Sequence, residues 1–74
     1  MEHTVQQIVA DIMGVPVASI HNDSSPDTIA SWDSLKHMNL MLALEQNFAV
    51  TFSEEQIAEM MNIELIILTI KDLL

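Results

Sequence analysis

Apolar residues recur at spacings of three and four along much of the chain, and this helical periodicity constrains the fold more than any other feature. The first such stretch predicts a helix over residues 4–13, begun by a capping box in which Thr4 is the cap. Gly14 follows the last periodic residue, where a left-handed residue commonly ends a helix. A second capping box, formed by Ser53 and Gln56, predicts the start of a short helix.

Two further helices are indicated by their caps and by apolar spacing. Asp33 is placed to begin a helix that extends to Phe48. Asn62 is placed to cap a last helix, in which isoleucines recur at spacings of three and four. The β-branched residues of that segment also fit a strand. A lone strand would have no partner in this chain, so we expect a helix.

The length and composition agree with a helical bundle. With 74 residues, the chain is expected to form a single domain, residues 1–74, around one small core. One glycine and two prolines provide too few tight turns for a sandwich or barrel. The sequence therefore predicts an all-α fold: a small four-helix bundle with three main helices, one short third helix and a long first loop.

The first loop, over residues 14–32, is rich in turn-forming residues. A connection of this length in so small a domain is usually functional or disordered. Apolar residues interrupt it, which favours a loop that packs on the core. These residues are Val15, Val17, Ile20, Ile29 and Trp32. We expect Trp32 to be a half-buried anchor that closes the loop over the bundle, with a docking residue as the alternative.

The charge of the chain limits its partners. The chain has eleven acidic residues and only two basic ones, Lys36 and Lys71, so its formal net charge is −9. Nucleic acid is not an expected partner, because contacts to phosphates need clustered Lys and Arg. Anionic membrane surfaces are disfavoured on the same ground. The longest apolar cluster, Ile63–Leu74, includes charged residues and is too short to span a bilayer.

The residue types also restrict the chemistry. No cysteine is present, so any thiol chemistry must be brought in from outside. The histidines have no metal-ligand spacing, and Asp23, Ser25 and Asp27 lack the glycine and distal glutamate of a calcium loop. We expect no metal site. No basic region precedes an apolar run at the N-terminus, so we expect no signal peptide and a cytoplasmic protein.

The second helix is too apolar for one narrow stripe. Its core face is expected to be formed by Leu40 and Leu44, together with Met41 and Phe48. A second apolar face is formed by residues that recur at spacings of three and four. It consists of Leu35, Met38 and Leu42. This second face is available to remain exposed, although burial in the core is the alternative.

The start of the second helix is suited to a modified serine. Asp33 at the cap can bond the free amides of the first turn, which places Ser34 at the first helical position. A phosphodiester on the Ser34 hydroxyl would lie at the positive end of the helix dipole, beside unpaired N–H groups. The same residues also fit an ordinary helix cap, so the local pattern permits this chemistry without requiring it.

Over nearly its full length, the sequence resembles the acyl carrier protein family, which is a small acidic four-helix domain with an Asp-Ser-Leu motif at the start of helix two. The resemblance is carried by Gly14-Val15, the long loop, Asp33-Ser34-Leu35, the segment Leu42-Ala43-Leu44-Glu45-Gln46-Asn47-Phe48, and Val50-Thr51-Phe52. Asp-Ser-Leu alone is unspecific. Its combination with the Leu-Glu-x-x-Phe ending is considerably more specific.

The resemblance implies that Ser34 carries a 4′-phosphopantetheine arm, which a phosphopantetheinyl transferase attaches from coenzyme A. The arm ends in a thiol that carries acyl groups as thioesters, which agrees with the missing cysteine. Asp33 and Leu35 complete the attachment motif. The family also implies a non-catalytic monomer that presents its cargo to acyl-loading and acyl-processing enzymes. The implied docking residues are Leu35, Met38, Leu42 and Glu45.

Departures from the family pattern point to a specialised carrier rather than the housekeeping fatty-acid member. Trp32 stands where a small or apolar residue is usual, and Lys36, His37 and Asn39 stand where fatty-acid carriers have acidic residues. A peptidyl or aminoacyl carrier, including the D-alanyl type, is the neighbouring hypothesis. Asp33 favours the acyl type, because peptidyl carriers usually have histidine there. An unmodified helical interaction module is the hypothesis from a different class.

Asp33, Ser34 and His37 also have the residue types of a hydrolytic triad. No oxyanion hole and no strained nucleophile turn are indicated, so we expect no catalytic residue. We expect His37 to face solvent or to take part in docking.

Overall fold

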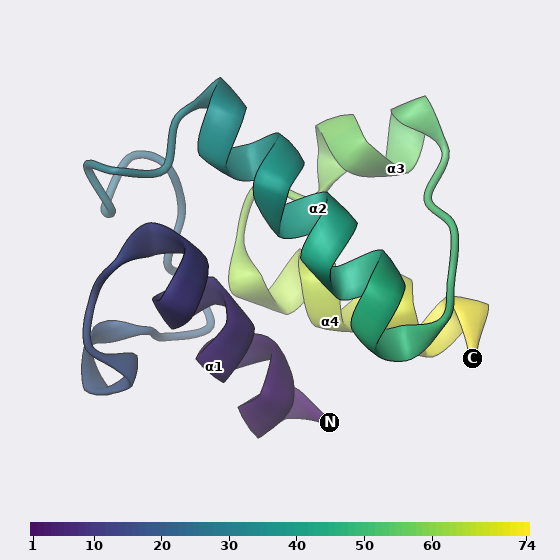
Figure 1. The fold of residues 1–74 in the computed structure, drawn as a ribbon, viewed down its shortest axis with the longest axis horizontal. Coiled ribbons are helices and arrows are strands. Elements are labelled where there is room, and N and C mark those ends of the chain that lie inside the picture. The colour runs from purple at the N-terminus through teal and green to yellow at the C-terminus, as the bar shows by residue number, and fades with distance from the viewer.

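The computed structural model describes all 74 residues, and four α-helices and one short 3₁₀ turn form the fold, with no strand (Figure 1). These elements are α1 (Glu2–Met13), η1 (Val17–Ser19), α2 (Ser34–Phe48), α3 (Glu54–Glu59) and α4 (Ile63–Leu73). The all-α prediction is confirmed, and so is the short third helix. The 3₁₀ turn within the long first loop was not predicted. No helix has the length and apolarity needed to cross a membrane.

The start of α1 differs from its prediction. The helix begins at Glu2 rather than at Thr4, and no side chain caps it. The carbonyl of Met1 accepts from the Val5 amide at 3.1 Å, so Thr4 already lies inside the first turn. Glu2 is well placed there, because the positive end of the helix dipole favours a carboxylate. The predicted Thr4 capping box is therefore wrong.

The other helix ends follow the sequence pattern. Gly14 ends α1 in the left-handed conformation at φ 70°, and its amide reaches the Ala10 carbonyl. Ser53 and Gln56 form the complete capping box of α3. The Asn62 side chain accepts from the Leu65 amide and caps α4. These predictions are confirmed, and α4 is a helix despite its β-branched residues.

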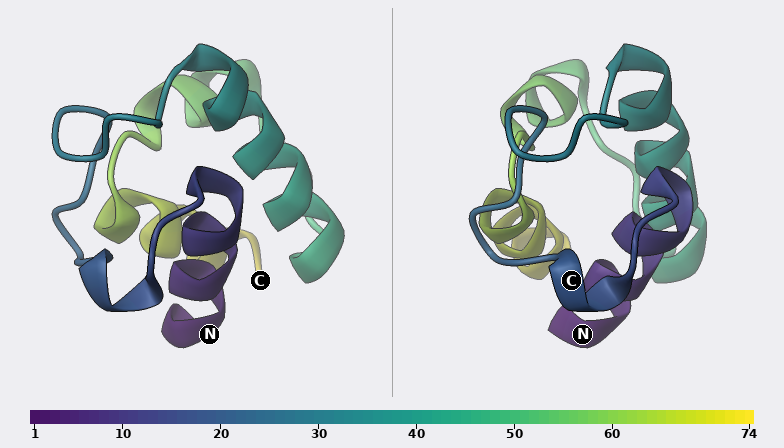
Figure 2. Two further views of the ribbon diagram at one scale, coloured as in Figure 1. Left: turned by 60° about the vertical axis from the view of Figure 1, so that its left-hand side comes forward. Right: turned by 90° about the vertical axis from the view of Figure 1, so that its left-hand side faces the viewer.

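The core lies where α1, α2 and α4 face one another (Figure 2). Isoleucine dominates the contribution of α4, while leucine and methionine dominate that of α2. The most deeply buried side chains are Val5, Val9, Leu40, Met41, Leu44, Met60, Ile63, Ile66 and Ile70. Leu40, Met41 and Leu44 thus form the core face predicted for α2, with Phe48 half-buried against it. Removal of this apolar surface from water is the main stabilising contribution.

The long first loop packs on the core, as its apolar residues predict. Ile20, Ile29 and Trp32 are buried. Trp32 anchors the loop as expected, but it is 3% exposed rather than half-buried. The loop also bonds the start of α4, since the Ser24 carbonyl accepts from the Ile63 amide at 3.3 Å. At its other end, the Ser31 hydroxyl donates to the Met13 carbonyl of α1 at 2.8 Å. The loop is thereby fixed to α1 and α4, and it leads into the start of α2.

Candidate functional site

Ser34 lies at the first position of α2 with its side chain exposed. The Asp33 carboxylate accepts from the Lys36 amide at 2.8 Å, and the Asp33 carbonyl accepts from the His37 amide at 2.8 Å. Asp33 is therefore the predicted cap, and its carboxylate is engaged with the helix rather than with Ser34. This arrangement holds the Ser34 hydroxyl on the rim of the helix start.

Ser34 is also distinguished from the other serines by its hydrogen bonding. Five of the six serines use their hydroxyls within the fold. These are Ser19, Ser24, Ser25, Ser31 and Ser53. The Ser34 hydroxyl serves no such purpose, so a covalent group on its oxygen would cost the fold no hydrogen bond.

The surroundings of Ser34 suit a phosphate group. The first amides of an α-helix have no intrahelical acceptor, and in α2 Asp33 already satisfies the amide of Lys36. The remaining amides, those of Ser34 and Leu35, are directed toward the helix start together with the positive end of the dipole of a 15-residue helix. The residues present therefore fit an anionic phosphodiester on Ser34.

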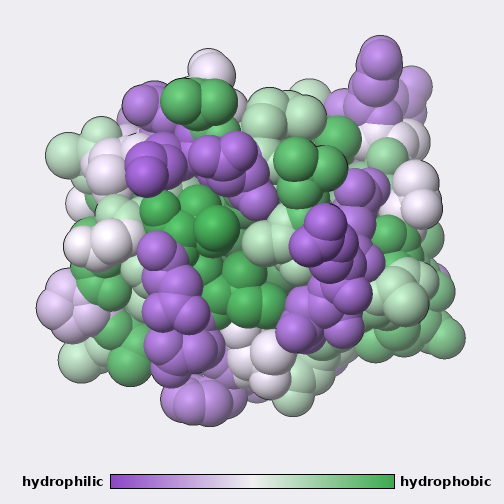
Figure 3. All heavy atoms as spheres, viewed as in Figure 1, coloured by the Kyte–Doolittle hydropathy of each residue, from purple (hydrophilic) through white to green (hydrophobic).

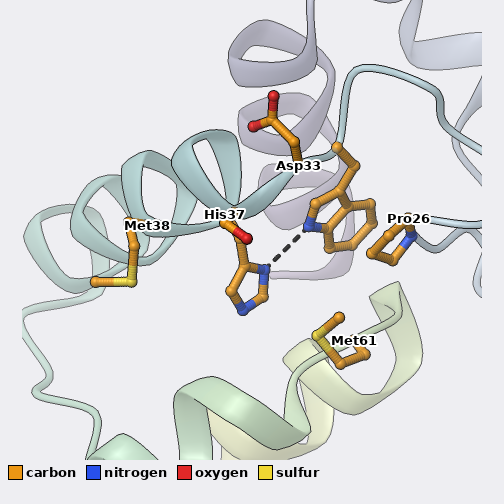
Figure 4. Close-up of a pocket in the computed structure, with 7 residues that line it drawn as sticks. Pro26, Asp33, His37, Met38 and Met61 are labelled. Carbon is orange, nitrogen blue, oxygen red and sulfur yellow. Dashed lines mark hydrogen bonds between the residues drawn. The ribbon is translucent and has the colours of Figure 1, made fainter.

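An open pocket of about 430 Å³ adjoins Ser34 (Figure 4). Its walls come from three segments that are distant in sequence: the long loop, the first turns of α2 and the turn between α3 and α4. The lining residues are Pro26, Trp32, Asp33, Ser34, His37, Met38 and Met61. Figure 4 shows Met61 across the pocket from α2, with Pro26 beside the indole ring.

His37 forms the inner part of this wall, and the expectation that it faces solvent is wrong. It is 9% exposed. The indole N–H of Trp32 donates to Nδ1 of His37 at 3.0 Å, and Nε2 of His37 lies 2.8 Å from the Ile57 carbonyl. Since an indole nitrogen can only donate, Nδ1 must accept. Nε2 therefore carries the proton and donates to Ile57, whose carbonyl lies in the last turns of α3.

The pairing of Trp32 with His37 follows from the position of the cap. Asp33 is the cap, so Trp32 precedes it by one residue and His37 is the fourth residue of the helix. These are the two positions of a hydrophobic staple, whose side chains pack against each other at a helix start. The ring planes are inclined by 22° and the ring centroids are 6.1 Å apart, so the two rings meet edge to edge through their hydrogen bond. Staple spacing was the signal that could have identified His37 as an interior residue.

This geometry also tests whether Asp33, Ser34 and His37 form a hydrolytic triad. Both ring nitrogens of His37 are occupied by hydrogen bonds to Trp32 and Ile57. A general base needs a free lone pair directed at the hydroxyl it activates. In this arrangement His37 cannot serve Ser34 as a base, so the residues do not form a triad.

The second apolar face of α2 is exposed. Leu35, Met38 and Leu42 are 70%, 46% and 54% exposed, respectively. Figure 3 shows hydrophobic groups at the surface among polar ones on the face where α1 and α2 lie. The alternative that these three side chains are part of the core is therefore wrong.

Glu45 has a contact inside the molecule. Its Oε2 accepts from the Phe52 amide at 2.8 Å, and the side chain is partly buried. The bond ties the connection between α2 and α3 back to α2. Whether Glu45 also contacts partners stays a prediction.

Comparison with known families agrees with this geometry. A family model described as the phosphopantetheine attachment site matches residues 3–70, which is nearly the whole chain. The fold and this match define a carrier domain. The chain belongs to the phosphopantetheine attachment family, whose domains bear the 4′-phosphopantetheine group and generally act as carriers rather than catalysts.

Proposed function

We propose that Ser34 is the attachment point of the 4′-phosphopantetheine arm and that the protein is a non-catalytic acyl carrier. The observation that carries this proposal is the combination of an exposed hydroxyl, a cap that leaves it unengaged, and helix amides beside it. When bound, the arm supplies the thiol that the sequence lacks. The chain's own residues supply the attachment oxygen and orient it outward.

The exposed face of Leu35, Met38 and Leu42 supports a role in docking. It begins one residue after Ser34 and continues along α2, so a partner seated on it would have its active site near the arm. Its apolar centre suits a partner surface of the same character. The net charge of −9 favours partners with basic surroundings, such as a transferase that binds coenzyme A.

The acyl type and a specialised pathway belong to the same proposal. Asp33 before the serine supports an acyl rather than a peptidyl carrier. The positions after Leu35 hold Lys36 and the buried His37, which leaves the start of α2 without a carboxylate run. Partners that bind the start of α2 must therefore depend on its apolar side chains more than on acidic ones. Fatty-acid, polyketide and lipid-modifying pathways all use carriers of this chemistry.

Modification by a transferase tests the attachment site. Purified protein is incubated with coenzyme A and a broad-specificity phosphopantetheinyl transferase, and its intact mass is measured. Wild type and the control Ser19→Ala should each gain one phosphopantetheinyl group, whereas Ser34→Ala should gain none. A wild type without added mass, or a modified Ser34→Ala variant, would contradict the proposal. Loading of the holo protein by an amino-acid-adenylating enzyme, in place of an acyl-activating one, would reassign it as an aminoacyl carrier.

A further inference from the structure

We propose that Trp32 and His37 form a proton-sensitive latch: the neutral imidazole holds the end of the long loop against α2, and protonation of its Nδ1 releases the Trp32 side chain. The latch consists of contacts within the chain, so it does not depend on attachment of the arm. Its position gives it a regulatory role, because Trp32 lies two residues before Ser34.

The two hydrogen bonds of the His37 ring require its neutral form. The Trp32 indole N–H donates to Nδ1 at 3.0 Å, and Nε2 donates to the Ile57 carbonyl at 2.8 Å. Protonation would place a hydrogen on Nδ1 as well, and an imidazolium ring has no acceptor. Two N–H groups would then face each other. The bond to Trp32 must therefore break, whereas the bond to Ile57 can remain.

No neighbouring charge offsets a proton on this ring. The only ion pair of the structure joins Lys71 to Glu2. Asp33 is the one charged residue in the pocket wall, and its carboxylate is engaged with the Lys36 amide and directed away from the imidazole (Figure 4). The other titratable side chains on the loop, α2, α3 and the start of α4 form no bond to the ring; they are His21, Asp23, Asp27, Lys36, Glu45, Glu54, Glu55, Glu59 and Glu64.

The structure leaves room for Trp32 to move. Its side chain is 3% exposed, and its indole N–H has no hydrogen-bond partner besides His37. A buried donor that loses its acceptor is unfavourable, so the released indole should turn toward water. The open pocket of about 430 Å³ adjoins the ring and can receive it.

The direction of the pH response follows from which form binds the proton. The latched form holds a neutral His37, and the released form can accept a proton, so a fall in pH favours release. Histidine ordinarily changes its charge between about pH 5 and 8, whereas carboxyl groups titrate at lower pH. His3 and His21 are exposed. A change at Trp32 within this range can therefore be assigned to His37.

Release of Trp32 would loosen the start of α2. Trp32 directly precedes the cap Asp33, and its contact with His37 closes the first turn of the helix. Without this contact, the Ser34 hydroxyl is held less uniformly for a transferase. Attachment at Ser34 should therefore slow when the latch opens.

The test follows the indole N–H signal of Trp32, the only tryptophan, in ¹⁵N-labelled apo protein between about pH 7.5 and pH 5.5. On acidification, we expect this signal to lose the shift of a hydrogen-bonded N–H and the proton to exchange with water severalfold faster. Tryptophan fluorescence should move to longer wavelength, because the ring becomes exposed. The ¹⁵N signals of the His37 ring should change at the same pH, and this comparison needs no substitution.

His37→Gln is the variant that cannot titrate. Its side chain offers an oxygen to the indole N–H and an NH₂ group to the Ile57 carbonyl. Its indole signal should not respond to pH, whereas the control His21→Gln, which changes an exposed histidine of the same loop, should respond as wild type does. The latch is overturned if the wild-type signal stays constant over this range, if His37→Gln responds equally, or if the indole and His37 signals change at different pH.

Attachment of the arm gives a second readout. With one transferase at each pH, the ratio of the wild-type rate to the His37→Gln rate should fall severalfold between about pH 7.5 and pH 5.5. A constant ratio would overturn the regulatory role at Ser34. If neither protein is modified at any pH, the attachment proposal fails, and the spectra of the apo protein still decide on the latch.

Discussion

Trp32 donates its indole N–H to Nδ1 of His37 across the first turn of α2, over a distance of 3.0 Å. Through Nε2, His37 continues the link to the Ile57 carbonyl of α3 at 2.8 Å. One side chain thus connects the end of the long loop, the start of α2 and the end of α3. It fixes the segments that surround Ser34 and the adjoining pocket.

Replacement of His37 by alanine is expected to destabilise the fold. The Trp32 N–H and the Ile57 carbonyl would each lose a partner, at a cost of about 1–3 kcal/mol per buried group. We expect the free energy of unfolding, measured by urea denaturation, to fall by about 2–4 kcal/mol. The exposed neighbour Asn39→Ala should change it by less than about 0.5 kcal/mol. Equal effects of the two substitutions would contradict the role given to His37.

A second prediction concerns the position of the proton on His37. Because Nδ1 accepts from Trp32, the neutral ring should exist as the Nε2–H form. The ¹⁵N chemical shifts of the ring nitrogens measure this directly at neutral pH. His3 and His21 are exposed, and they serve as internal controls that should show averaged forms. A protonated Nδ1 on neutral His37 would mean that the bond to Trp32 is absent.

Helix ends were predictable here because their causes are local. Asp33, Ser53 and Asn62 each bond an amide three residues along the chain, and such spacing is visible in a sequence. The start of α1 was mispredicted for a local reason too. Thr4 and Gln7 have capping-box spacing, but the Met1 carbonyl allows the helix to begin earlier. Spacing shows which caps are possible, and it does not show which of two competing starts the chain adopts.

The site was predictable only in part. Ser34, its cap and the exposed face of α2 all lie on one helix, so helical geometry was sufficient to place them. The pocket joins Pro26, α2 and Met61, and tertiary packing alone brings these segments together. His37 was misplaced because its polarity suggested solvent, whereas Trp32 and the Ile57 carbonyl satisfy both ring nitrogens. The burial of a polar residue whose hydrogen bonds are all satisfied is difficult to predict from composition.

The exposed face of α2 can be tested without disturbing the core. Leu42→Gln should leave stability within about 0.5 kcal/mol, because the side chain is 54% exposed. It should raise the KM for a phosphopantetheinyl transferase about tenfold, equivalent to about 1.4 kcal/mol of lost contact. Leu68→Gln on α4, where the side chain is 53% exposed, is the matched control and should leave KM unchanged. If both variants behave alike, α2 is not the docking helix for this enzyme.

Two substitutions test whether Glu45 has a docking role in addition to its bond with the Phe52 amide. Glu45→Gln keeps an oxygen that can accept from the Phe52 amide, whereas Glu45→Ala removes the acceptor. Thermal or urea denaturation should show a loss of about 1 kcal/mol for the alanine variant and little change for glutamine. If partners recognise the charge, both variants should slow arm attachment. Normal attachment to Glu45→Gln would confine Glu45 to its structural role.

The end of α2 offers a stabilising substitution. Ala49 adopts the left-handed conformation at φ 56°, and it is the only residue other than glycine with positive φ. An L-residue is disfavoured there because its Cβ approaches the following carbonyl oxygen. Ala49→Gly should therefore raise the free energy of unfolding by about 1 kcal/mol, measured as a higher urea midpoint with an unchanged slope.

Gly14 is the matched position for this comparison. It ends α1 at φ 70°, and an added Cβ would meet nothing within 4 Å. Gly14→Ala should therefore report backbone strain alone, with a loss of about 1–2 kcal/mol. Opposite signs at the two helix ends would show that the same left-handed strain governs both. A stabilising Gly14→Ala or a destabilising Ala49→Gly would show instead that the greater freedom of glycine in the unfolded chain outweighs that strain.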